Sequence, residues 1–154
     1  MGHSHTCLLY HVICGTKRRL PTIKPEVRER LDAYIGGILR AEQCSLLAAG
    51  GMPDHSHWLI RFHPSRPVSR VLEVFKSRSS GWASDTIEEL RGFKWQGGYS
   101  AFTVSQSNVD EVKAYIARQE EHHRTMTFEE EYVAFLKKHG VEYDPRYLWA
   151  EDDE

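Results

Sequence analysis

The sequence predicts an α+β protein whose elements follow the order strand, helix, strand, strand, helix, strand, with further helices at the C-terminus. Residues 6–14 are apolar on both alternating faces, as in the central strand of a sheet. Residues 26–41 carry apolar side chains at helical spacing. Turn residues at 50–54 then separate two short apolar runs, which is typical of a hairpin.

The hairpin strands are expected over residues 44–49 and 55–63. Ser69 is the predicted N-cap of the second long helix, which has Val71, Leu72 and Phe75 on its buried side. Residues 99–105 alternate well enough to form a fourth strand. This strand completes the predicted sheet.

Two capping patterns predict helices after the fourth strand. Ser107 with Asp110 resembles a capping box, and the helix it opens is expected to run to about Arg124. Thr127 with Glu130 repeats the pattern and opens a last amphipathic helix, which Gly140 is expected to stop. We therefore expect two C-terminal helices.

Composition predicts a single domain. A chain of 154 residues with 40% hydrophobic content fits one domain over residues 1–154, with residues 1–5 and 150–154 expected to be flexible. No apolar stretch approaches the ~20 residues of a membrane span, and no leader is apparent, so we expect a cytoplasmic protein without a membrane partner. The three cysteines are widely spaced and form no C-x-x-C pair, which argues against disulfides and a zinc ribbon.

The charge is unevenly distributed along the chain. The net charge is −2, but residues 129–154 hold nine acidic side chains against three basic ones, while residues 1–128 hold thirteen against seventeen. Local basic groups can therefore contact phosphates although the whole chain is not basic. A solvated charged face explains the same residues equally well. The candidate DNA-binding residues are Lys17, Arg18, Arg19, Arg70, Lys76 and Arg78.

Two histidines one residue apart, His55 and His57, open the third predicted strand. Residues i and i+2 of a strand point to the same face, so both imidazoles are within reach of one metal ion. Trp58 and Ile60 occupy the core side, which leaves the histidines on an open, mostly polar face. A second H-x-H match, at residues 3–5, lies at the N-terminus and is interpreted as solvated.

Tyr115 and Gln119 are four residues apart on the predicted helix after the fourth strand, and so share one of its faces. Together with the histidine pair they predict a phosphodiester site. A divalent metal held by His55, His57 and Gln119 polarises the phosphate while Tyr115 attacks phosphorus. The phenol needs activation because its ordinary pKa is near ~10.

The activating group is not identified by the sequence. His122 and Glu111 lie about one turn from Tyr115 on either side, and both are candidates. His11, His63 and His123 are interpreted as structural or surface residues rather than ligands.

The sequence resembles the single-tyrosine HUH transposases of small bacterial insertion sequences, including the REP-associated tyrosine transposases. The similarity runs in order over nearly the whole chain. The matching segments are Leu9-Tyr10-His11-Val12 with Thr16-Lys17, Met52 to Ile60 (MPDHSHWLI), Trp95 to Phe102 (WQGGYSAF), and Tyr115-Ile116 leading to Gln119-Glu120-Glu121-His122-His123.

The resemblance implies a ferredoxin-like, RRM-like antiparallel sheet (βαββαβ) and a homodimer whose composite sites can combine residues of two subunits. By position, His55, His57 and Gln119 are implied as ligands of Mg²⁺ or Mn²⁺, and Tyr115 as the nucleophile. The implied substrate is single-stranded DNA with hairpin ends, cut to leave a 5′-phosphotyrosine. Ser56 departs from the family, whose middle HUH residue is usually hydrophobic.

Two other interpretations remain open. The first is a domesticated or non-cleaving relative that binds hairpin DNA or RNA. The second is an α+β protein with a structural metal or none, which requires all the motif matches to be coincidental.

Overall fold

The computed structural model describes residues 2–149. Its centre is a four-stranded antiparallel sheet with strand order β2-β3-β1-β4, which confirms the predicted α+β fold and its ferredoxin-like topology. The expected flexible ends lie partly outside the described residues, since residues 1 and 150–154 are not described. The strands are β1 (Leu9–Gly15), β2 (Ser45–Met52), β3 (His55–Arg61) and β4 (Ser100–Val104).

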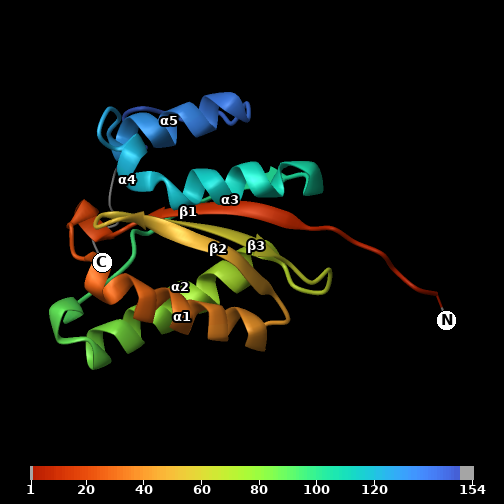
Figure 1. Ribbon diagram of the computed structural model, residues 1–154, viewed down its shortest axis with the longest axis horizontal. Helices are drawn as coiled ribbons and strands as arrows, with labels where there is room; N and C mark the ends of the chain where they lie inside the picture. Colours follow the sequence, from red (N-terminus) through yellow and green to blue (C-terminus); the bar gives the residue numbers. More distant parts are fainter. Residues whose placement is uncertain (1, 150–154) are drawn as a thin grey trace.

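Helices cover both faces of the sheet (Figure 1). Two long helices, α1 (Pro25–Ala41) and α2 (Val68–Thr86), pack side by side on one face. Three shorter helices cover the other face: α3 (Val109–Ala117), α4 (Gln119–His122) and α5 (Phe128–Lys138). Short 3₁₀ turns occupy residues 17–19 (η1), 88–90 (η2) and 106–108 (η3). No helix of the described residues is both long and apolar enough to cross a membrane.

The main core lies between the sheet and the two long helices. Trp58 is completely buried and meets the rings of Phe75 and Trp95 edge-on, with centroids 5.0 and 5.2 Å away. The alternation of β3 therefore works as predicted, with Trp58 and Ile60 anchoring the side opposite the histidines.

The C-terminal helices lie close against the other face. Gly50 of β2 is paired with His57, and a Cβ added to Gly50 would lie 2.7 Å from the backbone oxygen of Ile116 in α3. The absence of a side chain at Gly50 thus allows α3 to approach the sheet. α5 packs on the same face of the sheet, where Phe128, Tyr132 and Leu136 contact Ile13 of β1 and Phe102 of β4.

Two predicted helix starts are wrong. α2 begins at Val68 with Pro67 at its N-cap, because the fixed φ of proline already suits the helix entry, and Ser69 lies inside the first turn. Ser107 does not cap α3, because residues 106–108 form a 3₁₀ turn and the Ser107 hydroxyl lies 3.0 Å from that of Ser105. The Thr127–Glu130 capping box is confirmed at the start of α5.

The helix predicted over residues 107–124 is broken. α3 ends at Ala117, and Arg118 has φ −105° and ψ 28° before α4 starts at Gln119. The Arg118 N–H bonds to the Tyr115 carbonyl, which tightens the last turn of α3. Tyr115 and Gln119 therefore stand on two helices rather than one.

Candidate active site

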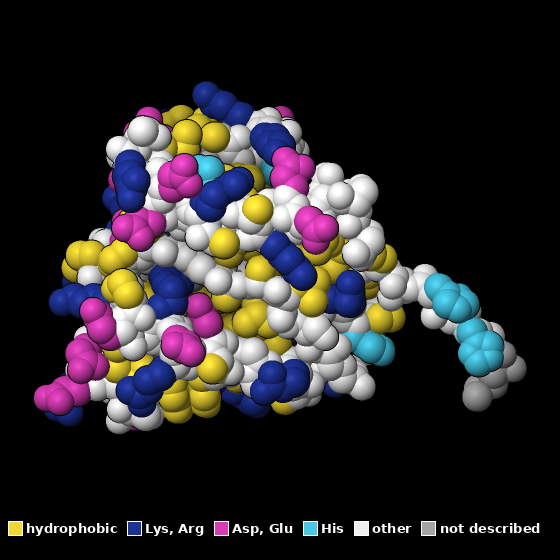
Figure 2. All heavy atoms as spheres, in the orientation of Figure 1, with side chains coloured by type: hydrophobic (Ala, Val, Ile, Leu, Met, Phe, Trp, Pro, Cys, Tyr) yellow, Lys and Arg dark blue, Asp and Glu magenta, His cyan; other side chains and the backbone are white. Residues whose placement is uncertain are grey.

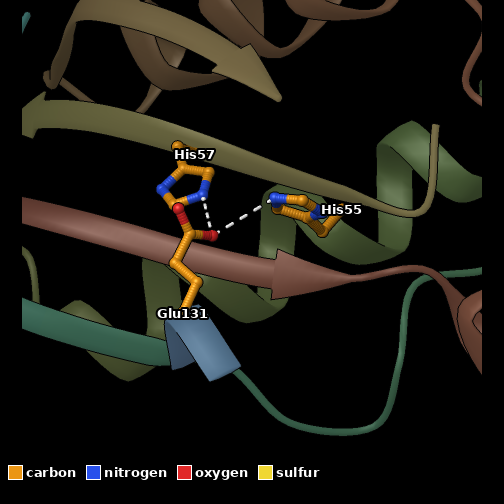
Figure 3. Close-up of side chains that lie close together, drawn as sticks. All are labelled: His55, His57 and Glu131. Carbon is orange, nitrogen blue, oxygen red and sulfur yellow. Dashed lines mark hydrogen bonds and ion pairs between the residues drawn. The ribbon is translucent and has the colours of Figure 1, made fainter. Parts of the chain in front are cut away.

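His55 and His57 lie side by side on β3, as the strand periodicity predicted (Figure 3). The expectation of an open sheet face is wrong, because both side chains are completely buried. They are covered by the C-terminal helices, whose approach across the sheet is not encoded in the pattern of β3 itself.

Hydrogen bonds hold both imidazole rings by their Nδ1 atoms. The Nδ1 atom of His55 lies 2.8 Å from the Asp54 carboxylate, and that of His57 lies 2.8 Å from Nε2 of His11. Such partners fix the orientation of metal-binding histidines and leave the other ring nitrogen free to bind. Both Nε2 atoms are directed toward the same region, which the C-terminal helices line.

Ser56 fits its buried position through a partner on α1. Arg28 donates hydrogen bonds to the Ser56 hydroxyl and to the backbone oxygens of Met52 and His55. The departure from a hydrophobic middle residue is thus satisfied by a polar contact, and Arg28 also fixes the backbone that carries His55. Burial lowers the pKa of Arg28, although Asp32 and Asp54 oppose this.

A carboxylate not predicted from the sequence, Glu131 of α5, meets the histidine pair (Figure 3). Its Oε1 atom lies 3.0 Å from Nε2 of His57 and 3.4 Å from Nε2 of His55. The three residues each offer one ligand atom, and these atoms all lie within 4.8 Å of one another. Only 1% of Glu131 is exposed.

Gln119 and Tyr115 join the same group despite the helix break. The side-chain oxygen of Gln119 lies 3.0 Å from Nε2 of His55, and Gln119 is 2% exposed. The hydroxyl of half-buried Tyr115 donates a hydrogen bond to Glu131. All four residues predicted for the reaction centre are therefore brought together within one chain.

Neither of the two residues considered for activation of Tyr115 accepts the hydrogen bond of its hydroxyl. His122 stacks on the Tyr115 ring with centroids 4.3 Å apart, and Glu111 is exposed. Both line a cavity of about 390 Å³ that opens beside Tyr115. The Tyr115 hydroxyl instead donates its hydrogen bond to Glu131.

His123, interpreted as a surface or structural residue, also reaches the site. Its Nε2 atom lies 3.1 Å from the side-chain oxygen of Gln119 and 3.2 Å from Glu131. His11 is likewise part of the site rather than only a core residue, through its contact with His57. The proximity of both residues depends on tertiary packing.

The electrostatics of the group reflect a buried anion among imidazoles. Burial lowers the pKa of His57 to about 4, against the opposing effect of Glu131. Burial also acts to lower the pKa of His55, but hydrogen bonds to Asp54 and Glu131 outweigh it and the pKa is raised. Hydrogen bonds from both histidines hold the pKa of Glu131 well below its usual range, although burial opposes them.

This donor set suits a divalent metal ion. A buried carboxylate needs a compensating charge, and among the described residues the ion-pair partners of Glu131 are histidines only. Imidazole, carboxylate and amide oxygens are all ordinary ligands of divalent metals. His55, His57, Glu131 and Gln119 would hold such an ion at the point where their donor atoms converge.

Glu131 could have been suspected from the helical pattern of its own segment. It lies three residues after Phe128 and four before Phe135, within the apolar stripe of the amphipathic helix. An acidic residue inside such a stripe is a signal for a buried carboxylate. In the sequence, however, Glu131 is the last of three consecutive glutamates at 129–131. Acidic residues are common in the first turn of any helix, so this position alone does not indicate a buried carboxylate.

The candidate DNA-binding residues fall into two separate groups. Lys17, Arg18 and Arg19 form η1 at the end of β1, where Arg19 pairs with Glu129 of α5 at 2.9 Å. The other three lie on α2, which covers the opposite face of the sheet from α5. On the face shown in Figure 2, basic and acidic side chains are interspersed rather than gathered in one basic patch.

Within the α2 group, the three side chains differ. The Lys76 ammonium donates to the backbone oxygens of Gln96 and Gly98, so it also secures the loop before β4. Arg70 and Arg78 are exposed, and Arg70 lies 3.9 Å from Glu73.

Solved structures of transposases resemble this fold. A Deinococcus radiodurans R1 protein described as a "putative transposase" is 26% identical and superposes with a TM-score of 0.63, covering 77% of this chain and 96% of its own. A REP-associated tyrosine transposase bound to a REP hairpin is 12% identical, with a TM-score of 0.57, covering 80% of this chain and 74% of its own; this likeness concerns the fold alone. No curated protein matches the chain.

The family comparison covers most of the chain. The family model described as "Transposase IS200 like" matches residues 4–119, a segment that contains both histidines of β3, Tyr115 and Gln119. This protein belongs to the IS200-like transposase family.

Proposed function

We propose that this protein is a metal-dependent transposase that cuts and rejoins single-stranded DNA through a covalent 5′-phosphotyrosine. The observation that carries the proposal is the convergence of a tyrosine hydroxyl with the His55, His57, Gln119 and Glu131 side chains. A nucleophile next to metal donors is what phosphodiester transfer needs. Family membership supports the same reaction class.

In the proposed step, the Tyr115 oxygen attacks the scissile phosphorus. The phenol gives its proton to solvent water, the bond between tyrosine oxygen and phosphorus forms, and the bond between phosphorus and the 3′ oxygen breaks. The departing oxygen takes a proton from solvent water to become a 3′ hydroxyl. Attack by a 3′ hydroxyl on the phosphotyrosine reverses the exchange. The number of phosphodiester bonds is conserved, so no nucleotide cofactor is consumed.

The residues of this chain divide the remaining tasks. His55, His57, Gln119 and Glu131 hold Mg²⁺ or Mn²⁺, which when bound supplies positive charge that polarises a phosphate oxygen. The 390 Å³ cavity beside Tyr115, with Arg118 and Lys138 among its lining residues, gives a charged DNA strand a route to the hydroxyl.

The proposed substrate is single-stranded DNA next to hairpins. The related REP-associated transposase was solved with a REP hairpin, which supports this choice. The six basic residues of η1 and α2 that were named as candidates are proposed to contact its phosphates. The homodimer implied by the resemblance remains a prediction.

One observation favours a second candidate function, a relative that binds hairpins without cutting. The donor side chains of His55, His57, Gln119 and Glu131 are at most 2% exposed, so a phosphate reaches them only if the covering helices give way or the cavity admits it. Binding of a hairpin requires no such access.

A labelling experiment separates the two functions. The protein is incubated with Mg²⁺ or Mn²⁺ and single-stranded DNA from the flanks of its own gene, labelled at the 3′ end. A transposase retains the label in a denaturant-resistant adduct, which Tyr115→Phe abolishes while DNA binding persists. Tyr99→Phe, at a more exposed tyrosine, is the matched control. Cleavage that persists in Tyr115→Phe refutes the assignment, and binding without any adduct establishes the second function.

A further inference from the structure

The two carboxylate oxygens of Glu131 face different partners. Oε1 lies 3.0 Å from Nε2 of His57 and 3.2 Å from Nε2 of His123. Oε2 accepts hydrogen bonds from the Tyr115 hydroxyl and from the Gln119 amide, the latter at 3.0 Å. One side chain thus connects the histidine group to the proposed nucleophile.

The contact with Gln119 decides which way its amide points. Because the NH₂ group donates to Oε2 of Glu131, the amide oxygen is left facing His55 at 3.0 Å. A glutamine without this partner can rotate by half a turn and present NH₂, which cannot bind a cation. Glu131 therefore directs the only atom of Gln119 that is able to act as a ligand.

The contact with Tyr115 fixes the hydroxyl relative to the same centre. Tyr115 lies on α3, whereas Gln119 lies on α4 beyond the break at Arg118. The helix alone does not hold the two side chains in register across this break. Both side chains donate to the same atom, Oε2 of Glu131, and this shared acceptor holds them next to each other.

Glu131 is itself firmly placed. α5 starts with a complete capping box, and the neighbours Phe128 and Tyr132 are at most 7% exposed. The residue lies beyond residue 119, where the family match ends. The carboxylate is therefore supplied by a segment outside the matched part of the chain.

We propose that Glu131 is a positioning residue, whose bridging carboxylate holds the Tyr115 hydroxyl and the Gln119 amide oxygen in place against the His55–His57 pair. This inference rests on the proposed function, because it assigns Tyr115 and Gln119 the roles given there. The competing interpretation is that the carboxylate occupies the place of the scissile phosphate and blocks the site. The two make opposite predictions for removal of the carboxylate.

Three full-length variants test the inference: Glu131→Ala, the isosteric Glu131→Gln, and Glu120→Gln as an exposed control on the adjoining helix. The rate of covalent attachment is measured at saturating DNA and Mn²⁺, and the DNA dissociation constant is measured separately. We expect a rate about 100-fold lower in both Glu131 variants, as small misplacements cause, with unchanged DNA affinity. Glu120→Gln retains the wild-type rate. An unchanged or increased rate in the Glu131 variants overturns the inference.

A spectroscopic measurement keeps the test independent of cleavage. Protein labelled with 3-fluorotyrosine gives a ¹⁹F resonance for Tyr115, assigned by its loss in Tyr115→Phe. Mg²⁺ is added at a concentration that saturates the metal site of each variant, as measured by calorimetry. It is expected to shift this resonance in the wild type and in Glu120→Gln but not in the Glu131 variants, because the carboxylate connects the two groups. An identical shift in Glu131→Gln refutes the bridge. If the wild-type protein forms no adduct, the proposed function fails, while the ¹⁹F response still decides the role of Glu131.

Discussion

Nε2 of His11 on β1 lies 2.8 Å from Nδ1 of His57 on the neighbouring strand β3, and both side chains are buried. For Nε2 of His57 to act as a ligand, its Nδ1 must carry the proton and donate it to His11. Burial and the neighbouring His57 keep the pKa of His11 well below its ordinary value, so His11 is neutral and its Nε2 is able to accept this hydrogen bond. A hydrogen bond from Nδ1 of His57 to His11 therefore favours the tautomer whose Nε2 is able to bind a metal in place of donating to Glu131.

The variant His11→Phe is expected to weaken Mn²⁺ binding by about 10- to 100-fold, the range found when such outer partners are removed. His11→Asn, which keeps a side-chain acceptor, should lose less. Isothermal titration calorimetry measures the affinity. His63→Asn is the control, because His63 is exposed and lies beyond the end of β3. Equal affinities in His11→Phe and wild type would show that His57 is oriented without this contact.

The assembly of the whole site within one chain predicts the result of a mixing experiment. His57→Ala and Tyr115→Phe are each expected to form no covalent adduct with DNA. A mixture refolded together should also remain inactive, because in the structure each chain combines its own histidines with its own tyrosine. Adduct formation by the mixture would demonstrate sites composed of residues from two subunits.

The capping box of α5 predicts a moderate loss of stability in Thr127→Ala. The Thr127 hydroxyl accepts from the Glu130 N–H at 3.1 Å, and the Glu130 carboxylate accepts from the Thr127 N–H at 3.2 Å. Loss of the side-chain cap costs about 1 kcal/mol of the free energy of unfolding. Urea unfolding checks the value against Thr86→Ala, an exposed threonine at the end of α2, which should change stability by less.

Replacement of two glycines by alanine is expected to change the free energy of unfolding in opposite directions. Gly50→Ala places a Cβ 2.7 Å from the backbone oxygen of Ile116, so α3 must shift, and we expect a loss of about 1–3 kcal/mol in the free energy of unfolding. Gly81 lies inside α2 with nothing within 4 Å of an added Cβ. Gly81→Ala is therefore expected to stabilise by about 0.5–1 kcal/mol. A neutral Gly50→Ala would contradict the close approach of α3 and β2.

Asp32 on α1 predicts a pH dependence of stability. Burial raises the pKa of its carboxyl from 3.8 to about 6, although Arg28 and a hydrogen bond from Trp58 oppose this. Below pH 3.8 the carboxyl is protonated in both the folded and the unfolded state. As the pH rises from 3.8 to about 6, the unfolded chain ionises first, so the free energy of unfolding falls, by about 3 kcal/mol in total.

Asp32→Asn should remove this part of the pH dependence, and urea unfolding at several pH values between 3.8 and 6 measures it. Asp85→Asn, at an exposed position of α2, should leave the profile as in the wild type. Parallel profiles of Asp32→Asn and wild type would show that Asp32 ionises alike in both states.

The fold was predictable because each strand and long helix carries its own periodicity. The alternation of residues along β3 is by itself enough to place Trp58 in the core and His57 on the other face. The break at Arg118 was not predictable in the same way, because no glycine or proline marks it. It depends on how the end of α3 packs against the sheet.

The site was predictable only as far as local spacing reaches. Strand periodicity places His55 with His57. The single helix predicted to carry Tyr115 and Gln119 is broken at Arg118, and these two side chains meet through Glu131. Glu131 meets His57 across 74 positions of the chain. Its role follows from the path of α5 over the sheet, which the pattern of neither segment contains.

Glu131 lies outside the part of the chain that an expression fragment based on the family match would contain. The family match ends at Gln119, and the bridging carboxylate follows twelve positions later on α5. An expression fragment cut at the boundary of the match would retain both strand histidines, the tyrosine and the glutamine, yet leave the pair of histidines uncovered and the tyrosine untethered. A fragment that keeps the Glu131 carboxylate in its place therefore includes α5, together with the residues around Trp149 that pack against it.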